Sequence, residues 1–184
     1  EPFNLPYCTF LVLPLVPLLV IRFLKTSKQH LFSGFTFGIG YFGLTFSWII
    51  NPFLVDPQKN IWLAPFAYFL FVSALSLFWA IAFYISNNLM KDEQEDSKKV
   101  FCLSILFALV ELLRCYLFSG FPWAILSYGW LDTPLSVFVT WFGPYIFNSI
   151  IIIVGINLLY SSTPNNVFKI VFLLTAFFGL ENNY

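Results

Sequence analysis

The sequence predicts an all-α membrane protein, a polytopic bundle of about six transmembrane helices. Of its 184 residues, 59% are hydrophobic and 22% aromatic, while only 10% are charged. Such a chain has too few polar side chains to cover the surface of a soluble globule. Apolar runs of near-membrane length also follow one another, separated by short polar breaks. The net charge is zero and no basic stripe is present, so we expect no nucleic-acid partner.

Six spans are expected, and each is taken as helical because a backbone in lipid must satisfy its own hydrogen bonds. The first contains Pro14 and Pro17 and the last is short, so we expect these two to be tilted, kinked or incompletely represented. The spans lie near residues 8–21, 31–50, 61–86, 100–118, 134–159 and 167–180.

The second span is rich in glycine, and Gly34 with Gly38 forms a pair of small residues four apart. Such a pair lets the backbone of another helix approach closely. We therefore expect a helix-packing face here rather than a ligand groove.

Lysine and arginine fall in alternate loops, which fixes the expected orientation. Loops 22–30, 87–99 and 161–169 carry these residues, whereas the opposite loops hold only Lys59. By the positive-inside rule the first three loops are cytoplasmic. Both termini and the loops 51–60 and 115–133 are then expected to face outward.

Among the charged residues, only Glu111 and Arg114 fall well inside an expected span. A charge there costs at least about 2.5 to 3.5 kcal/mol unless it finds a partner. Spacing of three residues puts both side chains on one helix face, where they can pair, and Arg114 can also reach toward the headgroups. Two interpretations stay open: a structural ion pair that pins this helix to its neighbours, and a functional site.

The stretch that follows, "SGFPW", is expected to form an outward turn. Gly120 permits tight backbone approach, and Pro122 rigidifies the chain just before Trp123. Trp123 and Trp48 are expected near the outer interface, where aromatic residues also gather in membrane proteins without any catalytic role.

The three cysteines, Cys8, Cys102 and Cys115, show no CxxC motif and no Cys/His spacing that suits a metal. We expect them to be small buried hydrophobic residues. The sequence therefore predicts no metal and no cofactor.

The run "ELLRCYLFSGFPWAILSYGWLDTPLSVFVTWFGPYIFN" resembles the signature stretch of bacterial apolipoprotein N-acyltransferases. In that family the stretch reads approximately E-x-L-R-G, then T/S-G-F-P-W, then G-Y, then a helix led by Pro-Leu. The runs "GFTFGIGYFGLTFSWI" and "EPFNLPYCTFLVLPLVPLL" resemble two further parts of the family, so the resemblance covers nearly the whole chain. Cys115 stands where the family usually has glycine, Ser127 stands where "GY" usually begins, and we expect the family's first helix to be missing from this stretch.

The resemblance implies a multi-pass protein of the bacterial inner membrane, in which a helical bundle holds a nitrilase-like catalytic domain against the outer face. In such enzymes a Glu/Lys/Cys triad takes an acyl chain from a phospholipid as a thioester. The chain then passes to the amino group of the diacylglyceryl cysteine that begins an apolipoprotein, which is covalent nucleophilic catalysis.

No part of that triad or domain is recognised in this sequence, so we expect no catalytic residue here and no activity from this chain alone. The chain would anchor the catalytic domain and shape the access of phospholipid. The residues expected to shape lipid and substrate access are Glu111, Arg114, Gly120, Phe121, Pro122, Trp123 and, more weakly, Trp48.

Two other functions remain as alternatives. In a small transporter or channel, Glu111 and Arg114 would line a polar path, although the sequence shows no internal repeat and the pair is expected nearer one face. In an inert membrane assembly protein, the same pair would be purely structural.

Overall fold

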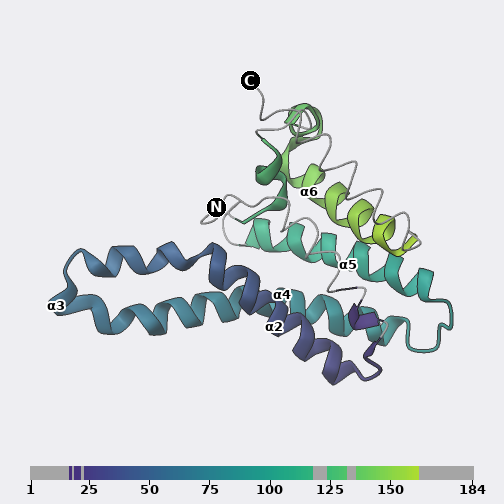
Figure 1. The fold of residues 1–184 in the computed structure, drawn as a ribbon, viewed down its shortest axis with the longest axis horizontal. Helices are drawn as coiled ribbons and strands as arrows, with labels where there is room; N and C mark the ends of the chain where they lie inside the picture. The colour runs from purple at the N-terminus through teal and green to yellow at the C-terminus, as the bar shows by residue number, and fades with distance from the viewer. Residues whose placement is uncertain (1–16, 18, 22, 118–123, 132–135, 162–184) are drawn as a thin grey trace, which may run out of the picture.

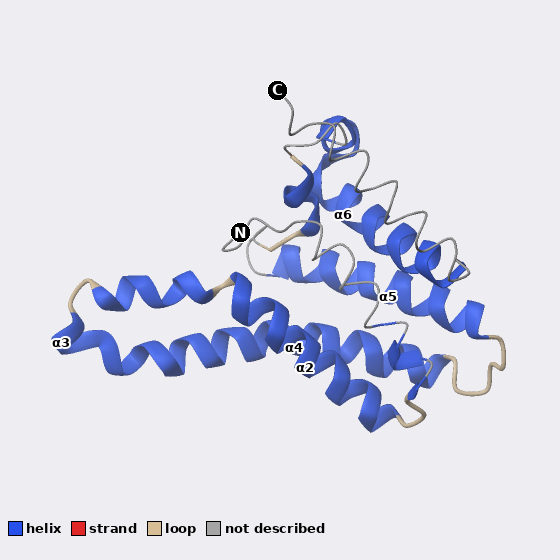
Figure 2. Cartoon of the chain, viewed as in Figure 1, coloured by secondary structure: helices blue, strands red, loops and turns tan. Residues whose placement is uncertain are grey.

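The computed structural model describes residues 17, 19–21, 23–117, 124–131 and 136–161. Within these residues the chain is helical, with no strand, as Figure 2 shows. The expectation of an all-α fold is therefore confirmed. The elements are α2 (Ser27–Thr45), η1 (Ser47–Leu54), α3 (Pro57–Asn60), η2 (Ile61–Leu63), α4 (Ala64–Leu89), α5 (Asp96–Leu117), η3 (Leu126–Trp130) and α6 (Ser136–Ser161).

Among the described residues, three helical segments are long and apolar enough to cross a membrane: Pro57–Leu89, Asp96–Leu117 and Ser136–Asn157. A fourth arises if α2 and η1 count as one span, although they meet at a bend of 48°. The expected spans near 8–21 and 167–180 fall largely outside the described residues.

The helix bounds differ from the expected spans by several residues at most ends, and two spans are also interrupted. Within the expected span 31–50 the α-helix ends at Thr45, and the 3-10 helix η1 follows it. The expected span 134–159 is broken at Gly143, where a positive φ of 76° precedes Pro144. Pro144 has no N–H to donate and its ring clashes with the preceding turn, so a new helix starts there. The expected outward loop 115–133 begins later, because α5 continues through Leu117.

Helices α2 and α4 lie side by side and antiparallel in Figure 1, and polar contacts mark both ends of the pair. At one end the Ser27 hydroxyl donates to Asn88 Oδ1. At the other end the Tyr68 hydroxyl donates to the carbonyl of Gly43. Tyr68 and Asn88 are 20 residues apart, which corresponds to about 30 Å of helix and matches the hydrocarbon thickness of a bilayer.

The expected packing face on α2 is confirmed. A Cβ atom built on Gly34 would lie 2.8 Å from the Trp79 carbonyl oxygen and 2.9 Å from the Cα of Ala80. A Cβ on Gly38 would lie 2.8 Å from both the Cα and the Cβ of Ser76. Ser76 and Ala80 are themselves small residues four apart, so the two helices touch backbone to backbone.

The core lies between α2, α4, α5 and α6, and it is strongly aromatic. Helix α2 contributes Phe42, α4 contributes Trp79 and Phe83, and α5 contributes Phe107, all at most 1% exposed. Helix α6 closes the cluster with Ile156, which is fully buried. The close contact of α2 with α4 brings these rings together around the middle of the bundle.

Replacement of Gly38 by alanine should separate α2 from α4, because the new methyl group has no room against Ser76. We expect the free energy of unfolding to fall by about 1 to 3 kcal/mol, the usual cost of overpacking. The matched control is Gly40→Ala on the same helix, where a Cβ would meet nothing within 4 Å. Unfolding in mixed detergent, followed by circular dichroism, measures both variants, and equal effects would contradict the packing assignment.

Candidate functional site

Glu111 and Arg114 lie in the last two turns of α5 and face the interior of the bundle. Glu111 is 3% exposed and Arg114 is 1% exposed. Their spacing of three residues places both side chains on one face of the helix, as the sequence predicts. The structure thus describes a fully buried ion pair in a helix that is apolar enough to span a membrane.

The two side chains meet through two parallel hydrogen bonds. Arg114 Nε donates to Glu111 Oε1 at 3.0 Å, and Arg114 Nη2 donates to Glu111 Oε2 at 2.8 Å. This two-pronged geometry matches the planar guanidinium to the carboxylate and is the strongest arrangement available to such a pair. Each charge therefore compensates the other inside the bundle.

A third residue, Trp79 on α4, completes the pair. Its indole Nε1 donates to Glu111 Oε1 at 2.6 Å, and the residue is 1% exposed. A buried indole N–H needs an acceptor, and a carboxylate is a strong one. Glu111 thus accepts hydrogen bonds from its own helix and from α4, which ties the two helices together.

Aromatic rings enclose this polar group. The ring of Trp79 lies 5.0 Å from Phe37, 5.0 Å from Tyr41, 4.8 Å from Phe42 and 4.9 Å from Phe107, measured between centroids. The guanidinium carbon of Arg114 lies 5.2 Å from the centroid of Phe42, within the range of a cation–π interaction. Rings packed this closely leave little space for water, so the hydrogen bonds act at a low local dielectric.

The depth of the site follows from α4. Trp79 is 11 residues from Tyr68 and 9 from Asn88, or about 16 and 14 Å along the helix. Glu111 is therefore bonded near the middle of the stretch between Tyr68 and Asn88 on α4. Along α5 it lies nearer one end, six residues from Leu117, so the expected position toward one face stays a prediction.

The chain just after the "SGFPW" stretch is held against α2 and α6. The Tyr41 hydroxyl donates to the carbonyl of Ala124 at 3.1 Å, and the backbone N–H of Leu126 donates to Asn148 Oδ1 at 2.8 Å. Ala124 has a φ of 62°, a left-handed conformation that residues other than glycine rarely adopt. Tyr41 also stacks on Trp79, with 28° between the ring planes.

The expected site residues are only partly brought together. Gly120, Phe121, Pro122 and Trp123 lie outside the described residues. Trp48 is 40% exposed in η1 and packs on Phe46 at 6.5 Å between ring centroids. Phe46 in turn lies 6.1 Å from Phe42, so two rings separate Trp48 from Arg114.

Sequence reasoning missed Trp79, Tyr41 and Asn148. Trp79 is a tryptophan in the middle of a long apolar run, away from the interfaces that tryptophan usually occupies. Its N–H was a signal that a polar partner had to lie inside the bundle. Asn148 is likewise an amide in the middle of an apolar span, where a polar side chain is costly unless paired.

The match to known proteins covers most of the chain. Residues 1–157 match the family described as Apolipoprotein N-acyltransferase N-terminal domain. The chain belongs to the apolipoprotein N-acyltransferase family. It is 36% identical over 102 residues to the apolipoprotein N-acyltransferase of Brucella suis biovar 1, a match that covers 55% of this chain and 19% of that protein. It is 32% identical over 139 residues to the apolipoprotein N-acyltransferase of Rhodopseudomonas palustris, covering 73% of this chain and 25% of that protein.

These matches span about a fifth to a quarter of the length of the curated relatives. The comparison with solved structures gave no match. The family assignment therefore rests on sequence. The buried Glu111–Arg114 pair lies within residues 1–157, the part of the chain that matches the family.

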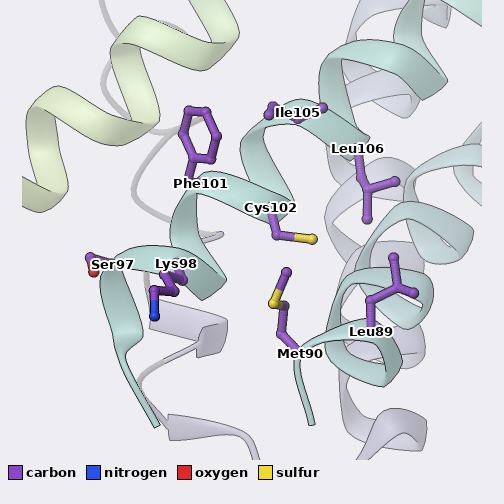
Figure 3. A pocket seen from close by; sticks show the side chains of 8 residues that line it. All are labelled: Leu89, Met90, Ser97, Lys98, Phe101, Cys102, Ile105 and Leu106. Carbon is purple, nitrogen blue, oxygen red and sulfur yellow. The ribbon is translucent and has the colours of Figure 1, made fainter. Parts of the chain in front are cut away.

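A separate pocket of about 600 Å³ opens where the end of α4 meets the start of α5 (Figure 3). Cys102 lines it and is partly exposed, so this cysteine is not the buried residue that was expected from the sequence. Figure 3 shows the side chain of Met90 directed toward Cys102, whereas the amine of Lys98 points away from Cys102. Lys98 Nζ instead pairs with Glu93 at 3.3 Å and with Glu95 at 3.2 Å.

Replacement of Trp79 by phenylalanine should loosen the contact between α4 and α5. Phenylalanine keeps an aromatic ring in the cluster but removes the donor to Glu111, and a hydrogen bond to a charged group contributes about 1.5 to 3 kcal/mol. We expect the free energy of unfolding to fall by that amount. Trp62→Phe is the matched control, because Trp62 is 63% exposed on η2. A Trp79→Phe protein as stable as the control would show that the indole N–H contributes nothing.

Proposed function

We propose that this chain is the membrane domain of a phospholipid:apolipoprotein N-acyltransferase. The full enzyme would transfer an acyl chain from a membrane phospholipid to the amino group of the diacylglyceryl cysteine of an apolipoprotein. The observation that carries the proposal is the family match over residues 1–157, together with the relatives that are named apolipoprotein N-acyltransferase. Lipoprotein maturation in a bacterial inner membrane is the process in which such an enzyme would act.

The membrane domain would contribute structure and lipid access rather than the nucleophile. The triad that the resemblance implies needs a cysteine beside an activating lysine and glutamate. Cys115 is buried next to Arg114 in the chain, and the Cys102 thiol lies in a pocket whose lining lysine, Lys98, is turned toward Glu93 and Glu95. Neither described cysteine has the arrangement that the chemistry needs.

The role of the pair within this function is to fix the bundle. Arg114 is 1% exposed and uses two of its N–H groups on Glu111, so in this conformation it does not extend toward the headgroups. An Arg114 contact with a phospholipid phosphate stays a prediction that requires the pair to open. Roles for Gly120, Phe121, Pro122 and Trp123 in lining the acyl path are likewise predictions.

We place the lysine-rich end of the bundle in the cytoplasm. The Ser27–Asn88 hydrogen bond brings the start of α2 next to the end of α4, so Lys25 and Lys28 lie at the same end as Lys91. At the opposite end, Lys59 is paired with Asp56 at 3.1 Å. This distribution agrees with the positive-inside rule, and it puts the segment 124–131 toward the outside.

A transporter or channel is disfavoured by the surroundings of the pair. A polar path needs water or polar groups along its length, whereas aromatic rings pack around Trp79, Glu111 and Arg114. A purely structural assembly protein would also keep such a pair, so the acyl-transfer assay separates it from the proposed enzyme.

The proposal predicts acyl transfer only when the nitrilase-like part is present. Membrane vesicles carrying either the 184-residue chain or a longer form that includes that part are given a diacylglyceryl peptide, and N-acylated product is measured by mass spectrometry. We expect product with the longer form, only when the peptide is on the outer side of right-side-out vesicles, and none with the 184-residue chain.

Each alternative outcome bears on a different statement. Product from the 184-residue chain would sink the claim that the nucleophile lies elsewhere. Product only in inverted vesicles would show that the chain has the opposite orientation in the membrane. No product from the longer form on either side would favour the assembly-protein alternative.

A further inference from the structure

Two parts of the signature stretch, the "ELLR" run on α5 and the residue that follows "SGFPW", are joined in space through other helices. Glu111 and Arg114 belong to the first part, and Ala124 directly follows the second. The contacts that connect them pass through α4 and α2, which lie outside the signature stretch. These contacts can all be followed in described residues.

The connection starts at the ion pair and continues through two aromatic residues. Glu111 accepts from Trp79 Nε1 at 2.6 Å, and Trp79 stacks on Tyr41 with ring centroids 5.0 Å apart. The Tyr41 hydroxyl then donates to the Ala124 carbonyl at 3.1 Å. Because Trp79 is fixed at its nitrogen by Glu111 and at its face by Tyr41, a change at either neighbour alters the position of the other.

The backbone at Ala124 is one that needs such support. Its φ of 62° is unfavourable for a residue with a Cβ atom, so external contacts must hold it. Tyr41 on α2 donates a hydrogen bond to the Ala124 carbonyl. Asn148 on α6 accepts a hydrogen bond from the backbone N–H of Leu126, two residues later. The segment 124–131 is thus bonded both to α2 and to α6, which are distant from each other in sequence.

We propose that Trp79 and Tyr41 are positioning residues that transmit the geometry of the Glu111–Arg114 pair to the backbone at Ala124. The pair then does more than neutralise two charges, since its arrangement determines how firmly the segment 124–131 is held on the bundle. The inference goes beyond the proposed function and does not depend on it, because it concerns the membrane domain alone.

Amide hydrogen exchange on the 184-residue chain in lipid nanodiscs tests this directly. Tyr41→Phe keeps the ring on Trp79 but removes the hydroxyl, and we expect peptides within 124–131 to exchange about tenfold faster, the factor for one lost hydrogen bond. Trp79→Phe should accelerate the same peptides, although the hydrogen bond that it removes goes to Glu111 and not to that segment. Peptides from the start of α2 and the end of α4, which the Ser27–Asn88 hydrogen bond joins far from Trp79, report whether the fold is retained.

The matched control is Tyr68→Phe, which removes another tyrosine hydroxyl that donates to a backbone carbonyl between α2 and α4. It should leave exchange in 124–131 unchanged. When Tyr41 is already phenylalanine, Trp79→Phe should add little further acceleration of exchange. The hydrogen bond from Tyr41 to Ala124, through which Trp79 acts, is then already absent.

Three results would overturn the proposal. The first is unchanged exchange in 124–131 for Tyr41→Phe. The second is an acceleration that is equal throughout the bundle or equal in the Tyr68→Phe control. The third is an exchange rate in 124–131 that Trp79→Phe leaves unchanged, or that in the double variant rises by the product of the two single-variant factors.

Discussion

The buried hydrogen-bonded unit of Trp79, Glu111 and Arg114 is the constraint on which the rest of this structure depends. Two charges inside a membrane-spanning bundle are tolerated only when each is fully paired. Here the carboxylate accepts two bonds from Arg114 and one from Trp79, all between 2.6 and 3.0 Å. Removal of any one partner leaves a polar group without compensation in a low-dielectric interior, so the three positions are fixed together.

The glycine face of α2 makes this unit possible. Gly34 and Gly38 bring the backbone of α2 against Ser76 and Ala80, on either side of Trp79 in the sequence of α4. The rings of Tyr41 and Phe42 are thereby placed against the indole and the guanidinium. The hydrophobic effect contributes little to helix association in lipid, since the lipid tails are equally apolar, so close van der Waals contact and interhelical hydrogen bonds must supply the specificity.

Much of this could be predicted from local sequence patterns, and the remainder depends on contacts between distant residues. Composition and apolar runs predicted the membrane helices, spacing predicted that Glu111 would face Arg114, and the Gly34–Gly38 pair predicted the packing face. The bend after Thr45 was missed because a single apolar run does not show where a helix changes direction, whereas the break at Gly143 was missed although Pro144 is a sequence signal for it. Trp79 was missed as a partner because it is 32 residues from Glu111, and only the packing of α4 on α5 reveals the contact.

The charge-swapped double mutant, Glu111→Arg with Arg114→Glu, tests the central claim most directly. A simple ion pair would survive the exchange, because the spacing of three residues is retained. In the three-residue unit the exchange would disrupt two further contacts. The Trp79 N–H would point at a cationic donor, and a carboxylate would face the ring of Phe42. We predict that the free energy of unfolding of the swapped protein falls by about 3 to 5 kcal/mol, as when a buried pair is broken. A swapped protein within about 1 kcal/mol of the original, as expected for an exchangeable pair, would contradict this account.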